Sequence, residues 1–201
     1  MSNKDFHQKR DFVHTEHKLG KVHYAVLIGL LVINLLHNIF LDAQILGHDT
    51  RYGLYIIAIP LILGLLFTAC YRRKFIWFKL NTAKGALLKS VSAGFYLLEG
   101  VFFSFLSFVF LAHAIWNYEN KTIAGQNPSE IIHCKVDKFV SGKNPAIDFR
   151  YQNRSEAIKT DYQTIREFKG EDPHKCELEI TVQKGIWNYY IIKGWTVNVD
   201  Q

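Results

Sequence analysis

The stretch GLYIIAIPLILGLLFTACY, residues 53–71, contains no charged side chain over 19 positions. Two further apolar stretches lie on either side of it, Tyr24–Leu41 and Val91–Trp116. A helix needs about 20 apolar residues to cross a hydrocarbon core of roughly 30 Å. The sequence therefore predicts an integral membrane protein with three transmembrane helices, at about residues 23–45, 53–71 and 91–116.

The charge of the chain supports the same class of protein. The 201 residues have a formal net charge of +6, yet residues 119–201 contain 12 Lys/Arg and 12 Asp/Glu. The whole positive excess therefore lies in residues 1–118. A basic protein often binds nucleic acid, but here the cations flank apolar segments, where they determine membrane topology. We therefore expect the lipid bilayer as a partner, and no nucleic acid.

The flanking cations also predict an orientation. Five Lys/Arg precede the first apolar stretch, one lies in the loop 47–52, and six lie in the loop 72–90. Lys and Arg are retained on the cytoplasmic side of short loops. We expect a multi-pass protein of the cell membrane with a cytoplasmic N-terminus and an extracytoplasmic C-terminal domain. The first apolar stretch is too long for the core of a cleavable signal peptide.

The residue pattern divides the chain into four parts. Residues 1–22 are a polar cytoplasmic arm, residues 23–118 form the transmembrane domain, and residues 119–129 are a polar linker with Gly125 and Pro128. From residue 130 apolar and polar residues alternate, as in strands with one buried face. Asp161 and Gly170 can begin and end one short helix. We expect a β-rich domain over 130–201 with five or six strands and one short helix.

One carboxyl group lies inside the predicted third span. Glu99 is about 12 Å from the inner edge at the helical rise of 1.5 Å per residue. The first span carries a polar stripe that should face the other helices, formed by Asn34, His37, Asn38 and Asp42. The functional interpretation is a proton- or ion-handling cluster of Glu99 with Asn34 and His37. The structural interpretation is a protonated Glu99, hydrogen-bonded across the bundle, that holds the three helices together.

The tail offers two weaker candidates. Cys134 and Cys176 lie on the apolar faces of their strands, so they form either a disulfide or two buried thiols. His133 and Cys134 point to opposite faces of a strand, which leaves too few converging ligands for a Cys/His metal site. We predict no metal site and no cofactor. Four aromatic residues form either a binding face or part of the core: Trp187, Tyr189, Tyr190 and Trp195.

The tail contains none of the common catalytic motifs, so we expect no enzyme activity. The leading hypothesis is a membrane-anchored extracytoplasmic module for binding or assembly, with a protein partner of the C-terminal domain or a second copy of the chain as candidate partners. The alternative is a small transporter, channel subunit or membrane enzyme that works at Glu99. A third hypothesis is metal handling by the chain's histidines.

Overall fold

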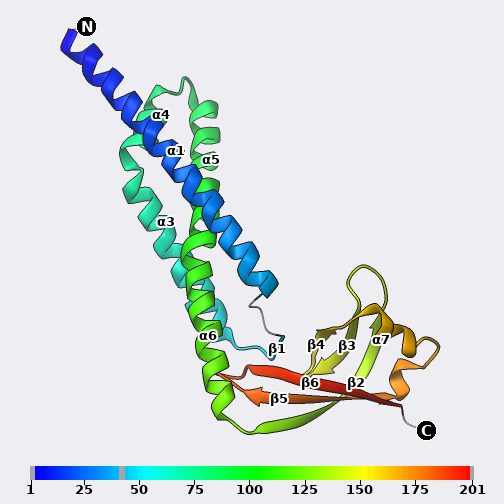
Figure 1. Cartoon of the computed structure of the whole chain (residues 1–201). Helices are drawn as coiled ribbons and strands as arrows, with labels where there is room; N and C mark the ends of the chain where they lie inside the picture. Colours follow the sequence, from blue (N-terminus) through cyan, green and yellow to red (C-terminus); the bar gives the residue numbers. More distant parts are fainter. Residues whose placement is uncertain (1–2, 41–43, 200–201) are drawn as a thin grey trace. The chain divides into compact units, whose positions relative to one another are not determined.

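The computed structural model describes residues 3–40 and 44–199 (Figure 1). The chain divides into two compact units. The first consists of Met1–Leu41 and Gly53–Ala114, and the second of Asp42–Tyr52 and Ile115–Gln201. The described part of the first unit is helical, and all six described strands belong to the second.

The helical unit is built from long apolar helices. Its elements are α1 (Asn3–Phe40), the π-helical segment η1 (Gly53–Ala58), α3 (Ile59–Tyr71), α4 (Arg73–Thr82), α5 (Ala86–Ser104), the π-helical segment η2 (Phe105–Val109) and the first turn of α6 (Phe110–Gln126). Three stretches are long and apolar enough to cross a membrane: Gly20–His37, Thr50–Tyr71 and Ala86–Gln126. The prediction of three long apolar helices is therefore confirmed.

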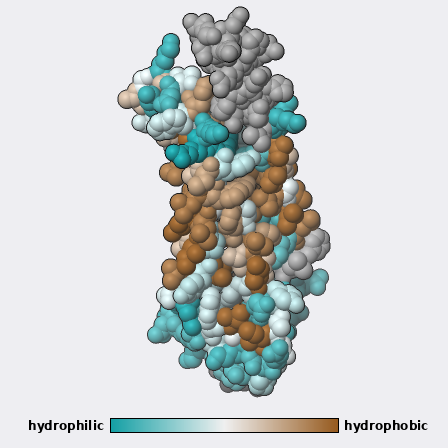
Figure 2. Space-filling view, turned by 90° about the vertical axis from the view of Figure 1, so that its left-hand side faces the viewer, coloured by the Kyte–Doolittle hydropathy of each residue, from teal (hydrophilic) through white to brown (hydrophobic). Residues whose placement is uncertain are grey.

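The apolar side chains of this unit mostly point outward. Only 11 to 22% of the residues in the three apolar windows are buried. Figure 2 shows the hydrophobic side chains gathered over the helices on the face in view. A soluble protein rarely exposes so large an apolar surface, so the outward face of the helices fits lipid as its solvent.

Small residues let α3 and α5 approach closely. A Cβ atom on Gly64 would overlap the Ser104 side chain, and Ser104 is fully buried. The Ser104 hydroxyl donates a hydrogen bond of 2.7 Å to the carbonyl of Leu61. Gly100 also lies against α3, where an added Cβ atom would meet the side chains of Leu65 at 3.4 Å and Thr68 at 3.7 Å.

A π-helical segment precedes the proline of the second apolar helix. Pro60 has no N–H, so the carbonyl of Ile56 lacks its usual helical donor. The chain accommodates this loss with the wider turns of η1, which end two residues before Pro60.

Three segments differ from their predicted form. Helix α1 begins at Asn3, where a polar arm is expected, and no Gly or Pro interrupts residues 4–19. Ile45 and Leu46, expected at the end of the first span and just after it, form a strand. Most of the expected linker, up to Gln126, continues helix α6. Here Asn117, Asn120 and Ala124 are buried at helical spacing, so the polar segment has a packing face.

The second unit is a six-stranded antiparallel sheet with the order β1-β6-β5-β2-β3-β4. Its strands are β1 (Ile45–Leu46), β2 (Ser129–Val140), β3 (Ala146–Tyr151), β4 (Arg154–Lys159), β5 (Cys176–Lys184) and β6 (Tyr190–Val199). Short helical turns complete the unit: α2 (Thr50–Tyr52), α7 (Tyr162–Glu167) and the 3₁₀ turn η3 (Pro173–Lys175). The predicted β-rich domain is confirmed, but its sixth strand comes from the first loop.

The sheet curls until its two edges almost meet. Next to the edge strand β1, the Gln44 side chain donates a hydrogen bond of 3.0 Å to the carbonyl of Lys159, at the end of the opposite edge strand β4. This near-barrel encloses a core of inward-facing residues that includes Leu46, Phe149 and Leu178. Near closure protects the strand edges, which would otherwise offer unpaired backbone groups to other chains.

The end of α6 is joined to the turn between β5 and β6. The Oδ1 atom of Asn120 accepts a hydrogen bond of 2.7 Å from the backbone N–H of Ile186. A Cβ atom on Gly185 would overlap the Asn120 side chain, so this close approach needs glycine. The bond satisfies a turn amide that the sheet ladder leaves free.

Candidate functional site

Three ionisable side chains meet inside the helical unit. Arg72, which directly follows α3, forms a hydrogen-bonded ion pair with Glu99 of α5. The Nε2 atom of His23, on α1, lies 3.4 Å from the same carboxylate oxygen. The three side chains are only 5 to 10% exposed. We call His23, Arg72 and Glu99 the charged triad.

The triad lies level with one end of the apolar helix α3. Arg72 comes immediately after Tyr71, the last residue of that helix. The 19 residues from Gly53 to Tyr71 correspond to about 28 Å at the helical rise, close to the thickness of a hydrocarbon core. Because Glu99 is paired with Arg72, its carboxylate lies level with the end of the apolar stretch Gly53–Tyr71. The count from Val91 places Glu99 too deep, because it takes Val91 as the edge of the apolar layer.

The other residues of the predicted intramembrane cluster lie elsewhere. Asn34 donates hydrogen bonds of 3.0 Å to the carbonyl of Leu106 and 2.8 Å to that of Leu30. Leu106 belongs to η2, where the π-helical geometry changes the pairing of backbone carbonyls. The His37 ring contacts the His113 ring, with 5.8 Å between the two centroids. The Asn38 side chain and Asp42 lie outside the described residues.

The opposite charges of the triad are paired with one another. The guanidinium of Arg72 compensates the Glu99 carboxylate, and His23 also stacks on Phe103, with 5.1 Å between centroids. The ion pair and the histidine connect three helices. A contact of Glu99 across helices is what the structural interpretation expects, but its partner is the cation Arg72 rather than a neutral hydrogen-bonding group.

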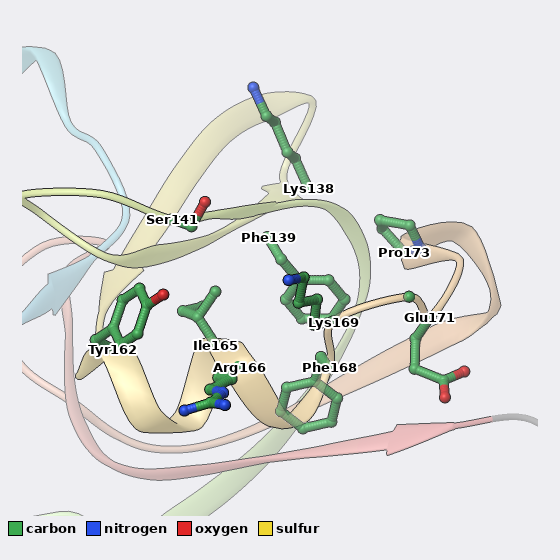
Figure 3. A pocket seen from close by; sticks show the side chains of 11 residues that line it. Lys138, Phe139, Ser141, Tyr162, Ile165, Arg166, Phe168, Lys169, Glu171 and Pro173 are labelled. Atoms are coloured by element: carbon green, nitrogen blue, oxygen red, sulfur yellow. The ribbon is translucent and has the colours of Figure 1, made fainter.

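A second site lies in the β-rich unit, between α7 and the end of β2. It is an open pocket of about 350 Å³ (Figure 3). The parallel rings of Phe139 and Phe168 stack at 5.1 Å between centroids beside it, and Tyr162 and Ile165 add further apolar surface. We call it the α7 pocket.

Cations surround the α7 pocket. Lys138, Arg166 and Lys169 line it together with a single carboxylate, Glu171. In Figure 3, Lys138 and Arg166 lie on opposite sides of the pocket, and the Lys138 side chain extends away from the aromatic rings. None of the three cations has a side-chain ion pair in the described part of the chain. The pocket therefore combines aromatic surface with an excess of positive charge.

Hydrogen bonds to Asp161 fix the start of α7, and a glycine ends the turn that follows it. The Asp161 carboxylate accepts a hydrogen bond of 2.8 Å from the backbone N–H of Thr164 and one of 2.9 Å from its hydroxyl. These bonds hold the pKa of Asp161 below its ordinary value. Gly170, with φ of +103°, ends the turn after the helix in a conformation that suits glycine. The short helix predicted between these two residues is confirmed.

The four aromatic residues of the predicted binding face do not share one surface. Tyr189 packs on Trp116, with 5.0 Å between ring centroids, and Trp187 stacks on the same indole at 6.5 Å. Tyr190 contacts Tyr151, and Trp195 packs against the core. These contacts make the aromatic side chains part of the packing of the β-rich unit.

Cys134 and Cys176 are both buried, and neither forms a disulfide within the part of the chain that the structure describes. Cys134 lies opposite Leu178, so Cys176 is displaced by two residues on the neighbouring strand. Cα atoms in such diagonal positions are typically about 7–8 Å apart, whereas disulfides need Cβ atoms within about 4.5 Å. A bridge between these cysteines stays a prediction, and it requires movement of the strands.

Sequence reasoning identified Glu99 but missed its partners and the α7 pocket. Arg72 belongs to the cluster of cations after the second apolar stretch, where a topology signal is the simpler interpretation of the sequence. The signal for the pocket is the combination of Phe139 and Phe168 with nearby cations. This combination is not visible in the sequence, because Phe139 and Phe168 are 29 positions apart in the chain.

Comparison with known proteins gives no relative. No family model matches the sequence, and neither the curated proteins nor the solved structures include a match. The functional argument therefore depends on the geometry of this chain alone.

Proposed function

We propose that this protein is a membrane-anchored binding protein of the cell membrane. Its three apolar helices form the anchor, and its β-rich unit binds a small anion with an apolar or aromatic body in the α7 pocket. The observation that carries the proposal is the pocket itself, where unpaired cations surround stacked aromatic rings. Concave sites with apolar walls and a few convergent polar groups are typical of small-ligand binding.

The chain's own connections support an extracytoplasmic β-rich unit. The first loop, Asp42–Tyr52, and residues 115–201 belong to the same compact unit. Both must then lie on one side of a membrane, as three spans require. The loop 72–90, with six Lys/Arg, lies on the other side, which the positive-inside rule makes cytoplasmic.

The structure does not favour the rival function at Glu99. That hypothesis rests on a cluster of Glu99, Asn34 and His37, and in the described residues these side chains have separate partners. The Glu99 carboxylate is already compensated by Arg72. We therefore propose that the charged triad holds the anchor together and that recognition takes place in the β-rich unit.

Isothermal titration of the full chain in an uncharged detergent tests the proposal. The probe is 1-naphthyl phosphate, an aromatic ring with an anionic group, and 1-naphthol is its uncharged counterpart. We expect the phosphate to bind and the alcohol to bind at least tenfold more weakly. Exposed charge pairs contribute up to about 1 kcal/mol each, so Arg166→Gln with Lys169→Gln should weaken binding roughly tenfold or more.

Lys143→Gln is the matched control, because Lys143 is an exposed lysine of the β-rich unit outside the pocket. This variant should bind the phosphate as the unmodified chain does. Equal binding by the double variant and the control would contradict a site at the α7 pocket. So would the absence of any difference between the phosphate and the alcohol.

A further inference from the structure

A histidine and two glutamates converge on the outer face of the sheet. His133 lies on β2, and Glu177 and Glu179 lie on β5. The strand register places His133 directly opposite Glu179 and one step diagonal to Glu177. Because side chains alternate along a strand, all three point away from the core that contains Cys134 and Leu178. Their side chains are 34 to 53% exposed.

The donor atoms already have the spacing of metal ligands. The Nδ1 atom of His133 is 3.3 Å from a carboxylate oxygen of Glu177 and 3.8 Å from one of Glu179. All three donor atoms lie within 4.8 Å of one another. Ligands bound at about 2.1 Å in a tetrahedral zinc site are roughly 3.4 Å apart. A metal ion could therefore enter with side-chain adjustments alone.

The sheet, rather than a loop, positions these ligands. Glu177 and Glu179 are held on one strand, paired on both sides, and His133 is held on the central neighbouring strand. Sites built on such rigid elements keep their geometry better than sites on loops. The charge also favours a cation, since two carboxylates face one imidazole and Lys135, opposite Glu177, is the nearest competing cation along β2.

We propose that His133, Glu177 and Glu179 bind one divalent transition-metal ion, with zinc as the expected metal. One imidazole nitrogen with two carboxylates is a borderline donor set, which suits zinc better than magnesium or calcium. Water would complete the coordination of this open site. Sequence analysis predicted no metal here because it considered the thiols, which point into the core. The two glutamates supply the missing ligands from the neighbouring strand.

Zinc titration of the full chain, purified without a histidine tag and stripped with a chelator, tests the site. Isothermal titration at pH 7.5 in uncharged detergent should show an equivalent of zinc that is lost in His133→Gln. The Glu179→Gln variant should bind that equivalent at least tenfold more weakly. Magnesium should not compete. Zinc binding at His133, Glu177 and Glu179 does not depend on anion binding in the α7 pocket. Either proposal can therefore be contradicted without the other.

His174→Gln is the matched control, since His174 is an exposed histidine of the same unit outside the cluster. This variant should bind as many equivalents of zinc as the unmodified chain. Zinc bound by histidines elsewhere in the chain contributes equally to the isotherms of all variants. Circular dichroism verifies that each variant is folded. The same zinc isotherm for the unmodified chain, His133→Gln and Glu179→Gln would overturn the proposal.

Discussion

At the scale of single residues, the charged triad is the most sensitive feature of the anchor. Replacing Arg72 with Gln leaves the Glu99 carboxylate buried without its counter-charge. Breaking a buried ion pair from one side typically costs about 3–5 kcal/mol. We expect Arg72→Gln to lower the free energy of unfolding in detergent by about 3 kcal/mol, measured by denaturant titration.

Two comparisons make this prediction specific. Lys74→Gln removes an exposed cation two residues away and should leave stability unchanged within about 0.5 kcal/mol. Removing Arg72 and Glu99 together, as Gln and Gln, should be less harmful than Arg72→Gln alone, since no charge is stranded. If Arg72→Gln is as stable as Lys74→Gln, the triad does not hold the helices.

The two buried cysteines give a second prediction at this scale. Burial raises the pKa of the Cys134 thiol, which lowers the fraction of reactive thiolate at a given pH. We expect maleimide to modify Cys134 and Cys176 at least tenfold more slowly in the native chain than in denaturant at pH 8. Mass spectrometry of the modified peptides measures the rates.

The same reaction in denaturant without a reductant decides the state of the two thiols. Because neither cysteine forms a disulfide in the described structure, we expect both to become labelled. If both resist labelling until a reductant is added, the chain carries the disulfide that its cysteine pattern also allows. Sequence alone leaves this open, because it gives the face of each strand but not the offset between strands.

At the scale of elements, the contact between α3 and α5 depends on Gly64. A larger side chain there would collide with Ser104 and Phe108. Overpacking a well-filled interface typically costs about 1–3 kcal/mol. Gly64→Val should therefore lower the free energy of unfolding by about 2 kcal/mol. Gly29→Val is the control, because a Cβ atom at Gly29 meets nothing within 4 Å. Equal effects of the two changes would disprove the close contact.

The strand β1 tests whether the first loop belongs to the β-rich unit. Leu46 is 1% exposed and lies in the same core as the C-terminal strands. Leu46→Ala should destabilise the unit by about 2–5 kcal/mol, as expected for a buried leucine. Ile131→Ala, at an exposed position of β2, should cost under 1 kcal/mol. A harmless Leu46→Ala would show that the loop is not part of the sheet.

Periodicity in the sequence predicted most elements, because apolar runs and alternation are local signals. It correctly indicated three apolar helices, a β-rich tail and the helix after Asp161, but it did not single out β4. It missed β1, since two residues are too few to show alternation, and this strand exists only through its pairing with β6. It also missed the end of α6, where buried Asn120 accepts a hydrogen bond from a distant turn that local pattern cannot reveal.

At the level of the whole molecule, the proposed function combines an anchor in lipid with a recognition unit that we place outside the cytoplasm. The apolar surface of the three helices fits lipid. The first loop and the tail belong to one compact unit, so both belong on the same side of a membrane. Under the positive-inside rule, the asymmetric cations predict which side that is. The orientation stays a prediction from sequence, whereas the α7 pocket and the His133 cluster are visible only in the folded sheet.

Labelling of single introduced cysteines in intact cells tests this central claim most directly. Lys143→Cys lies in the β-rich unit, and Lys79→Cys lies in the loop between the second and third apolar stretches. With a membrane-impermeant maleimide, the account predicts labelling of Lys143→Cys in intact cells and of Lys79→Cys only after permeabilisation. Labelling in the reverse order, or a chain that fractionates as soluble protein without detergent, would contradict it.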